Sequence, residues 1–177
     1  SHFLERAVAA KQSGYIVGVA THCNTDTARI ESLGIEVFPT SMTRRGLNPI
    51  RELATIFALA RIYRRFRPHL IHHVALKPIV LGSIATLSIR NIKILTAPIG
   101  MGYIFSSDDT RAHLLRPFLR FALRHLLNFR DSQVIIENQD DYDHLIEENY
   151  VDSNNILLIR GAGVNLNIYK EAPEPVS

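Results

Sequence analysis

A short run of histidine and lysine residues follows an apolar segment in the middle of the chain. His72 and His73 lie at the end of that segment, and Lys77 and Pro78 come soon after it. A lysine next to the start of a helix can bind an anion, because its ammonium group and the free backbone N–H groups of the first turn attract negative charge. A surface lysine beside a prolyl helix start has the same spacing. The pattern therefore leaves both interpretations open.

The histidines at positions 69, 72 and 73 do not predict a metal site. Adjacent histidines on a strand point to opposite faces, and no Asp or Glu lies near them in the sequence. A metal site needs several ligands that converge on one point. We therefore expect no metal here.

Three further segments follow apolar runs and carry glycine or amide and acidic side chains. Gly100 and Gly102 precede Tyr103 and allow a tight bend and a close approach to a ligand, although turn geometry alone explains them as well. Asn138 and Asp141 follow another apolar run, and residues of these types either cap a helix or face a cleft. The last segment carries Arg160, Gly161 and Gly163, which fits a hinge between domains or an ordinary terminal loop.

These segments connect regularly alternating helices and strands. Such alternation predicts a doubly wound, mainly parallel, Rossmann-like α/β sheet with helices on both faces, in which ligands bind at the carboxyl ends of the strands. The predicted strands span residues 15–20, 35–38, 70–74, 92–97, 134–137 and 156–159. The predicted helices span residues 3–12, 26–33, 49–67, 78–88, 109–128 and 140–148.

The composition is that of one globular domain. The chain has 177 residues, of which 46% are hydrophobic and 21% charged, so disorder is excluded. The longest apolar run, residues 79–89, is too short to span a bilayer. No segment resembles a secretory signal, and a single cysteine, Cys23, excludes an internal disulfide framework and fits a reducing cytoplasm.

The charge is strongly asymmetric along the chain. The net charge is +3, yet residues 41–130 carry +12 and residues 131–177 carry −8. A basic block attracts phosphates, anionic lipid or nucleic acid, although a solvated surface is the alternative. Two helical arginine clusters are predicted to face a membrane, and they comprise Arg61, Arg64 and Arg65 with Arg116, Arg120 and Arg124.

Taken together, four strand-end motifs resemble the amino-terminal domain of family 4 glycosyltransferases. They are His-His-Val-Ala-Leu-Lys-Pro, Gly-Met-Gly-Tyr-Ile-Phe, Glu-Asn-Gln-Asp-Asp and Ile-Arg-Gly-Ala-Gly-Val-Asn, in this order. The resemblance is greatest to the bacterial branch that builds capsule, O-antigen and related glycans on polyprenyl-diphosphate carriers. It covers residues 3 to about 169.

This resemblance implies one half of a GT-B fold. Residues 1–170 would form the acceptor-binding domain and residues 171–177 the start of the linker to an absent donor-binding domain. The full-length enzyme would be a retaining hexosyltransferase that takes a nucleotide-sugar donor and a lipid-linked glycan acceptor. The paired glutamates of the family's chemistry would lie in the absent half, so we expect no catalytic residue and no cofactor here, and no activity of this chain alone. The implied location is cytoplasmic, on the inner face of the plasma membrane.

The resemblance also implies which residues bind the acceptor and which lead to the linker. The acceptor-binding set is His72, Lys77, Gly100, Gly102, Tyr103, Asn138 and Asp141. The interdomain set is Arg160, Gly161 and Gly163.

Three departures from the family pattern are clear. Ile99 stands where a small hydroxyl residue is expected, and Asn165 stands where an Asp is usual. The family also begins with a central strand that this chain lacks. Because that loss leaves two strand edges unpaired, we expect the protein either to close the gap or to pair with another copy.

Rival functions remain open from the sequence. A non-catalytic subunit that anchors to a membrane or presents an acceptor to a separate donor-binding chain would carry the same motifs. Nucleic-acid binding is less favoured, because no recognition-helix motif or aromatic stacking sheet accompanies the basic block. A GT-B epimerase is the weakest alternative.

Overall fold

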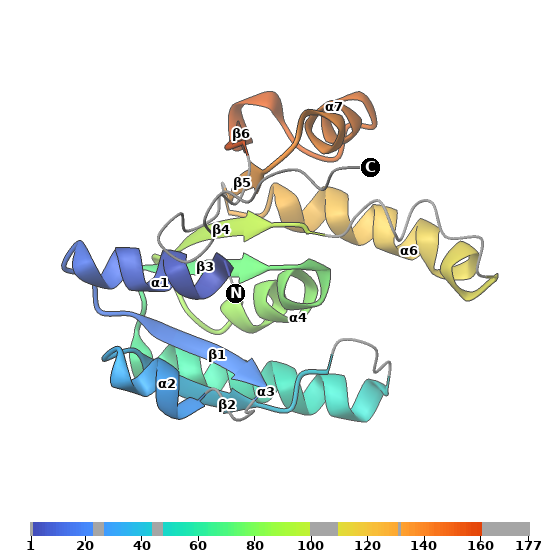
Figure 1. Ribbon diagram of the computed structural model, residues 1–177. Coiled ribbons are helices and arrows are strands. Elements are labelled where there is room, and N and C mark those ends of the chain that lie inside the picture. The colour runs from blue at the N-terminus through green and yellow to red at the C-terminus, as the bar shows by residue number, and fades with distance from the viewer. Residues whose placement is uncertain (1, 23–26, 44–47, 100–109, 131, 161–177) are drawn as a thin grey trace, which may run out of the picture.

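The computed structural model describes residues 2–22, 27–43, 48–99, 110–130 and 132–160. Helices and strands alternate along these residues, as the sequence predicts (Figure 1). The strands are β1 (Gly18–His22), β2 (Glu36–Thr40), β3 (Leu70–Val74), β4 (Lys93–Ala97), β5 (Gln133–Ile136) and β6 (Ile156–Leu158). The helices are α1 (His2–Gln12), α2 (Thr27–Ser32), α3 (Pro49–Phe66), α4 (Leu76–Thr86), α6 (Thr110–Leu127) and α7 (Gln139–Glu147), with a short 3₁₀ turn at Ser153–Asn155.

The described strands form two parallel sheets instead of one. The smaller sheet pairs β1 with β2, and the larger has the order β3-β4-β5-β6. In a doubly wound sheet of order 3-2-1-4-5, β2 and β1 correspond to strands 3 and 2, and β3 and β4 to strands 4 and 5. The break between the sheets therefore falls where the first strand of that order would lie. The α/β class with parallel strands is confirmed.

Of the two expectations for this break, one is wrong. The described residues do not close the gap, because β1 and β3 belong to different sheets. Closing it would require β1 and β3 to come within the roughly 4.8 Å that separates paired strands, and the described residues show no pairing between these two strands. Pairing with another copy stays a prediction.

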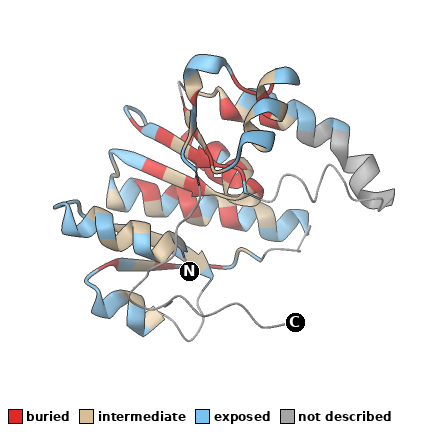
Figure 2. Ribbon diagram, turned by 45° about the horizontal axis from the view of Figure 1, so that its top comes forward, coloured by how far each residue is buried: buried red, intermediate tan, exposed pale blue. Residues whose placement is uncertain are grey.

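Two buried clusters hold helices against the larger sheet (Figure 2). One packs Ile79 of α4 and Leu127 of α6 against Val134 of β5. The other packs Leu59 of α3 against Ile71 of β3 and its neighbours. In contrast, residues 3–12 of α1 and all of α2 include no buried residue, so the core belongs mainly to α3, α4, α6 and the larger sheet.

Capping fixes the start of α3. The Asn48 side chain accepts hydrogen bonds from the backbone N–H groups of Ile50 (3.0 Å) and Arg51 (3.3 Å). Pro49 takes the first helical position, where its missing N–H costs nothing. The predicted helix start is confirmed, and it sets the register of the polar side chains described below.

Most element boundaries differ by one to three residues from the sequence-based prediction, and two of these differences have a clear local cause. β1 begins at Gly18 rather than at residue 15, because Gly14 turns at φ 90° and the Tyr15 N–H caps α1 at the Ala10 carbonyl. α4 begins at Leu76 rather than at Pro78, since proline is tolerated in the first turn of a helix. Lys77 therefore lies inside the first turn of α4. Among the described residues, no helix has the length and apolar content needed to cross a membrane.

Candidate functional site

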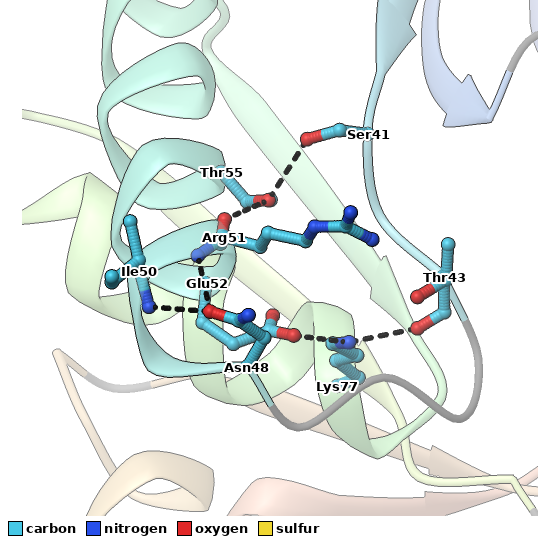
Figure 3. Close-up of polar contacts among 8 residues, drawn as sticks. All are labelled: Ser41, Thr43, Asn48, Ile50, Arg51, Glu52, Thr55 and Lys77. Carbon is cyan, nitrogen blue, oxygen red and sulfur yellow. Dashed lines mark hydrogen bonds and ion pairs between the residues drawn. The ribbon is translucent and has the colours of Figure 1, made fainter.

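The carboxyl end of the sheets brings together polar groups from the segment after β2, from α3 and from α4 (Figure 3). The Lys77 ammonium donates to the Thr43 carbonyl (2.7 Å) and forms an ion pair with Glu52 Oε1 (2.6 Å). Both side chains of that pair are about one-fifth exposed, at 21% and 20%. The pair therefore ties the start of α4 to the first turn of α3, at the end of the sheet where ligands bind in this class of fold.

Further hydroxyl and carboxylate groups surround this pair. Thr55 donates to the Arg51 carbonyl (2.9 Å), and its hydroxyl lies 3.3 Å from that of Ser41. The second carboxylate oxygen of Glu52 is buried and has no hydrogen-bond partner among the described residues. A buried carboxylate oxygen gains free energy from a donor. A hydroxyl-bearing ligand is therefore chemically suited to this cluster.

The backbone between β3 and α4 is strained. Ala75 has φ 73° and ψ 161°, a conformation that is essentially restricted to glycine. Hydrogen bonds on both sides hold it there, because its N–H donates to the Ala97 carbonyl (2.9 Å) and its carbonyl accepts from the Ile79 N–H (3.1 Å). Strained residues cluster at ligand sites, and this one sets the direction in which the first turn of α4 meets Glu52.

Replacing Ala75 with glycine is expected to stabilise the protein by about 1 kcal/mol, because the strain of about 1–3 kcal/mol is relieved at the cost of a more flexible unfolded chain. Urea unfolding would measure the change. The matched control is Ala54→Gly on the exposed side of α3, which should destabilise by about 1 kcal/mol. Destabilisation by both substitutions to the same extent would show that Ala75 is not strained.

His72 lies near the ion pair between Arg6 of α1 and Glu137 after β5. Burial lowers the pKa of His72, and the positive charge of Arg6 lowers it further. Its Nε2 atom is buried and has no partner among the described residues. His72 is thus a neutral imidazole at physiological pH, on the side of β3 that faces α1.

His73 belongs to the core rather than to this cluster. Its side chain is 3% exposed, and its Nε2 atom lies 3.2 Å from the Tyr63 hydroxyl. Burial lowers the pKa of His73 to about 4, with a smaller contribution from the charge of His72. The two histidines therefore lie in different environments, as their adjacency on a strand predicts. Among the described residues, no three His, Cys, Asp or Glu side chains form a group suited to a metal ion.

Asn138 and Asp141 bond to each other at the start of α7. The Asn138 side chain accepts from the Asp141 N–H (2.7 Å) and donates to the Asp141 carboxylate (2.8 Å). Asn138 is thus the helix cap, one of the two uses that its residue type suggested. Glu137 beside it reaches Arg6, so this loop forms a second polar group at the carboxyl end of the larger sheet.

The remaining predicted site residues lie on the surface or outside the described residues. Arg160 is described and exposed. In the basic set, the exposed residues are Arg61, Arg64, Arg65, Arg120 and Arg124. Arg124 also donates to the Glu148 carbonyl (2.8 Å) and lies over the Tyr150 ring. The residues outside the described positions are Gly100, Gly102, Tyr103, Gly161 and Gly163, and the side chain of Arg116 is also outside them.

Sequence reasoning missed several residues of these clusters, among them Glu52, Arg6 and Ala75. Glu52 gave one signal, as an acidic residue in the first turn of a helix that starts at the carboxyl end of a strand. Arg6 gave none, because its partner Glu137 lies 131 residues away. Ala75 gave none either, because an alanine carries no mark of a left-handed backbone.

Comparisons with known proteins show which folds and which family this α/β arrangement resembles. In a comparison with solved structures, nine chains match, among them the crystal structure of a glycosyltransferase from Rickettsia africae ESF-5, with a TM-score of 0.67 and 18% sequence identity. The match covers 94% of this chain and 40% of that one. The family model described as glycosyl transferase 4-like matches residues 1–138. The chain belongs to the glycosyl transferase 4-like family. No curated protein matches it.

Proposed function

We propose that this chain is the acceptor-binding part of a retaining hexosyltransferase that moves a sugar from a nucleotide-sugar donor to a polyprenyl-diphosphate-linked glycan in cell-surface polysaccharide synthesis. The observation that carries the proposal is the polar cluster of Lys77 and Glu52 at the carboxyl end of the sheets. A donor-binding domain would face this edge and supply the catalytic groups. The chain alone would bind acceptor without transferring sugar.

The chemistry of the cluster suits a glycan diphosphate. Lys77 and the N–H groups of the first turn of α4 attract phosphate oxygens. Glu52 accepts hydrogen bonds from sugar hydroxyls, and its ion pair with Lys77 fixes the orientation of its carboxylate. His72 and the Arg6–Glu137 pair, together with Asn138 and Asp141, extend the same edge towards β5 and α7.

A lipid-linked acceptor requires an enzyme that works at a membrane. The exposed arginines at positions 61, 64, 65 and 120 would each contribute about 1 kcal/mol of attraction to an anionic surface. The protein would then lie on the cytoplasmic face of the plasma membrane. Pairing of the open β1 and β3 edges with a second copy belongs to the same proposal.

The test is a kinetic assay of the full-length enzyme with a panel of nucleotide sugars and a polyprenyl-diphosphate acceptor. Lys77→Met should raise the KM for the acceptor about tenfold or more, since a charge-assisted contact contributes about 1.5–3 kcal/mol. The KM for the donor should stay unchanged. Lys93→Met is the control, because Lys93 is exposed at the opposite end of the neighbouring strand.

A double variant separates binding from local unfolding. Lys77→Met leaves the Glu52 carboxylate without its counter-charge, so Lys77→Met combined with Glu52→Gln removes that cost. If Lys77 contacts the acceptor, the KM of the double variant exceeds that of Glu52→Gln alone. Equal KM values for these two variants, or no transfer to any polyprenyl-diphosphate acceptor by the unmodified enzyme, would refute the proposal.

A further inference from the structure

A cavity of about 470 Å³ lies at the opposite end of the larger sheet from the candidate acceptor site. It is formed where α3 and α4 end and where β3 and β4 begin. Its walls are formed by the end of α3 with the turn that follows it and by the turn that follows α4. The lining residues are Tyr63, Arg64, Arg67, Pro68, His69, Ile89, Arg90 and Asn91.

The cavity is strongly basic. Arg64, Arg67 and Arg90 are exposed, and none of the three forms an ion pair within the described part of the chain. The described residues that line the cavity include no acidic side chain. Because guanidinium groups bind phosphate in a bidentate manner, three of them around one cavity favour a phosphate ligand.

Two left-handed backbone positions line this same cavity. Arg67 has φ 50° and is the C-cap of α3, a common place for this conformation. Asn91 has φ 55°, which asparagine tolerates better than most residues do. The Arg67 N–H donates to the Tyr63 carbonyl (2.9 Å), and Arg130 donates to the Thr86 (3.1 Å) and Ile89 (2.9 Å) carbonyls. These bonds give the cavity walls a fixed shape.

Compensation of the helix dipoles does not account for all of these arginines. Basic residues often neutralise the negative carboxyl end of a helix. At the end of α4, however, Arg130 already bonds to the Thr86 carbonyl and the Ser88 hydroxyl to the Ala85 carbonyl. Arg90 lies beyond that end, so its charge remains available to a ligand.

We propose that this cavity is a phosphate-binding site in which Arg64, Arg67 and Arg90 hold a phosphate group away from the acceptor site. The phosphate belongs either to a small soluble molecule or to a phospholipid headgroup. Leu87, which is 62% exposed and lies two residues before Ile89 of the cavity lining, would provide an apolar contact for the second source. The site does not depend on the proposed transferase activity.

The test is binding of the whole chain to two probes at physiological salt. Calorimetry measures affinity for inorganic pyrophosphate, and co-sedimentation measures binding to phosphatidylcholine vesicles with and without phosphatidic acid. The cavity variant is Arg64→Gln with Arg90→Gln. The matched control is Arg61→Gln with Arg65→Gln, which removes the same charge from exposed positions of the same helix that do not line the cavity.

For pyrophosphate, we expect the cavity variant to weaken binding about tenfold or more and the control to change it less than about twofold. On acidic vesicles both variants lose the general attraction of two arginines, so a headgroup site requires a loss in the cavity variant about tenfold larger than the loss in the control. If the cavity variant loses pyrophosphate binding, the ligand is a soluble phosphate. If it loses only binding to the vesicles that contain phosphatidic acid, the ligand is a lipid headgroup. Equal losses in both double variants, or no binding of either probe by the unmodified chain, would overturn the proposal. Both variants should unfold within about 2 °C of the unmodified chain, and Lys77→Met should leave pyrophosphate binding at the cavity intact.

Discussion

Lowering the pH from about 7 to about 4.5 is expected to cost about 2.5 kcal/mol of folding free energy through His73 alone. Burial lowers the pKa of His73 from its ordinary 6.5 to about 4 in the folded protein. Between these two values the unfolded chain binds the proton and the folded chain does not, so stability falls as the pH falls. The contribution is fully present above about pH 6.5 and is lost progressively towards pH 4.

Urea unfolding at both pH values would measure this loss. His73→Gln keeps an acceptor for the Tyr63 hydroxyl and removes the titration, so its stability should depend less on pH by about 2.5 kcal/mol. His69→Gln, an exposed histidine just before the same strand, is the control and should keep the full dependence. Identical pH profiles for His73→Gln and the unmodified protein would contradict a buried neutral imidazole.

Gly82→Ala is expected to destabilise the protein by about 3 kcal/mol. A Cβ atom at Gly82 would lie 2.6 Å from Cδ2 of His73 and closer still to its Nε2 atom. The clash pushes the imidazole away from the Tyr63 hydroxyl and disturbs the packing between α4 and β3. It outweighs the gain of about 1 kcal/mol that alanine brings to a helix interior.

A double-mutant cycle isolates this contact. In a His73→Ala background the imidazole is gone, so Gly82→Ala should become stabilising by about 1 kcal/mol through helix propensity. Urea unfolding of the four proteins gives the coupling energy. A stabilising Gly82→Ala in the unmodified background would show that α4 and β3 do not approach each other closely.

The order and type of the elements could be predicted from the sequence. Local signals decide them, such as Asn48 and Pro49 at the start of α3 and the apolar segment that becomes β3. Local signals do not determine where each element begins. Pro78 fits either the start or the first turn of a helix, and the Tyr15 N–H caps α1 instead of joining a strand.

The polar clusters were predicted only in part. Lys77 and Asn138 each follow a predicted strand. The sequence therefore places both at the carboxyl edge of the sheet, because the carboxyl ends of parallel strands share one edge. The partner of Lys77 did not follow, since Glu52 reaches it only through the packing of α3 beside α4. The basic cavity also depends on tertiary structure, because Arg64 and Arg90 meet only where two helices end together.

The division of the strands into two sheets gives α3 a mechanical role. Its 18 residues join one sheet to the other, and a helix of this length is a stiff rod of about 27 Å. Glu52 lies near one end of the rod, and Arg64 lies near the other. If the smaller sheet shifts against the larger, α3 must therefore tilt or slide as one rigid body. Such a movement would displace Glu52 and Arg64 together.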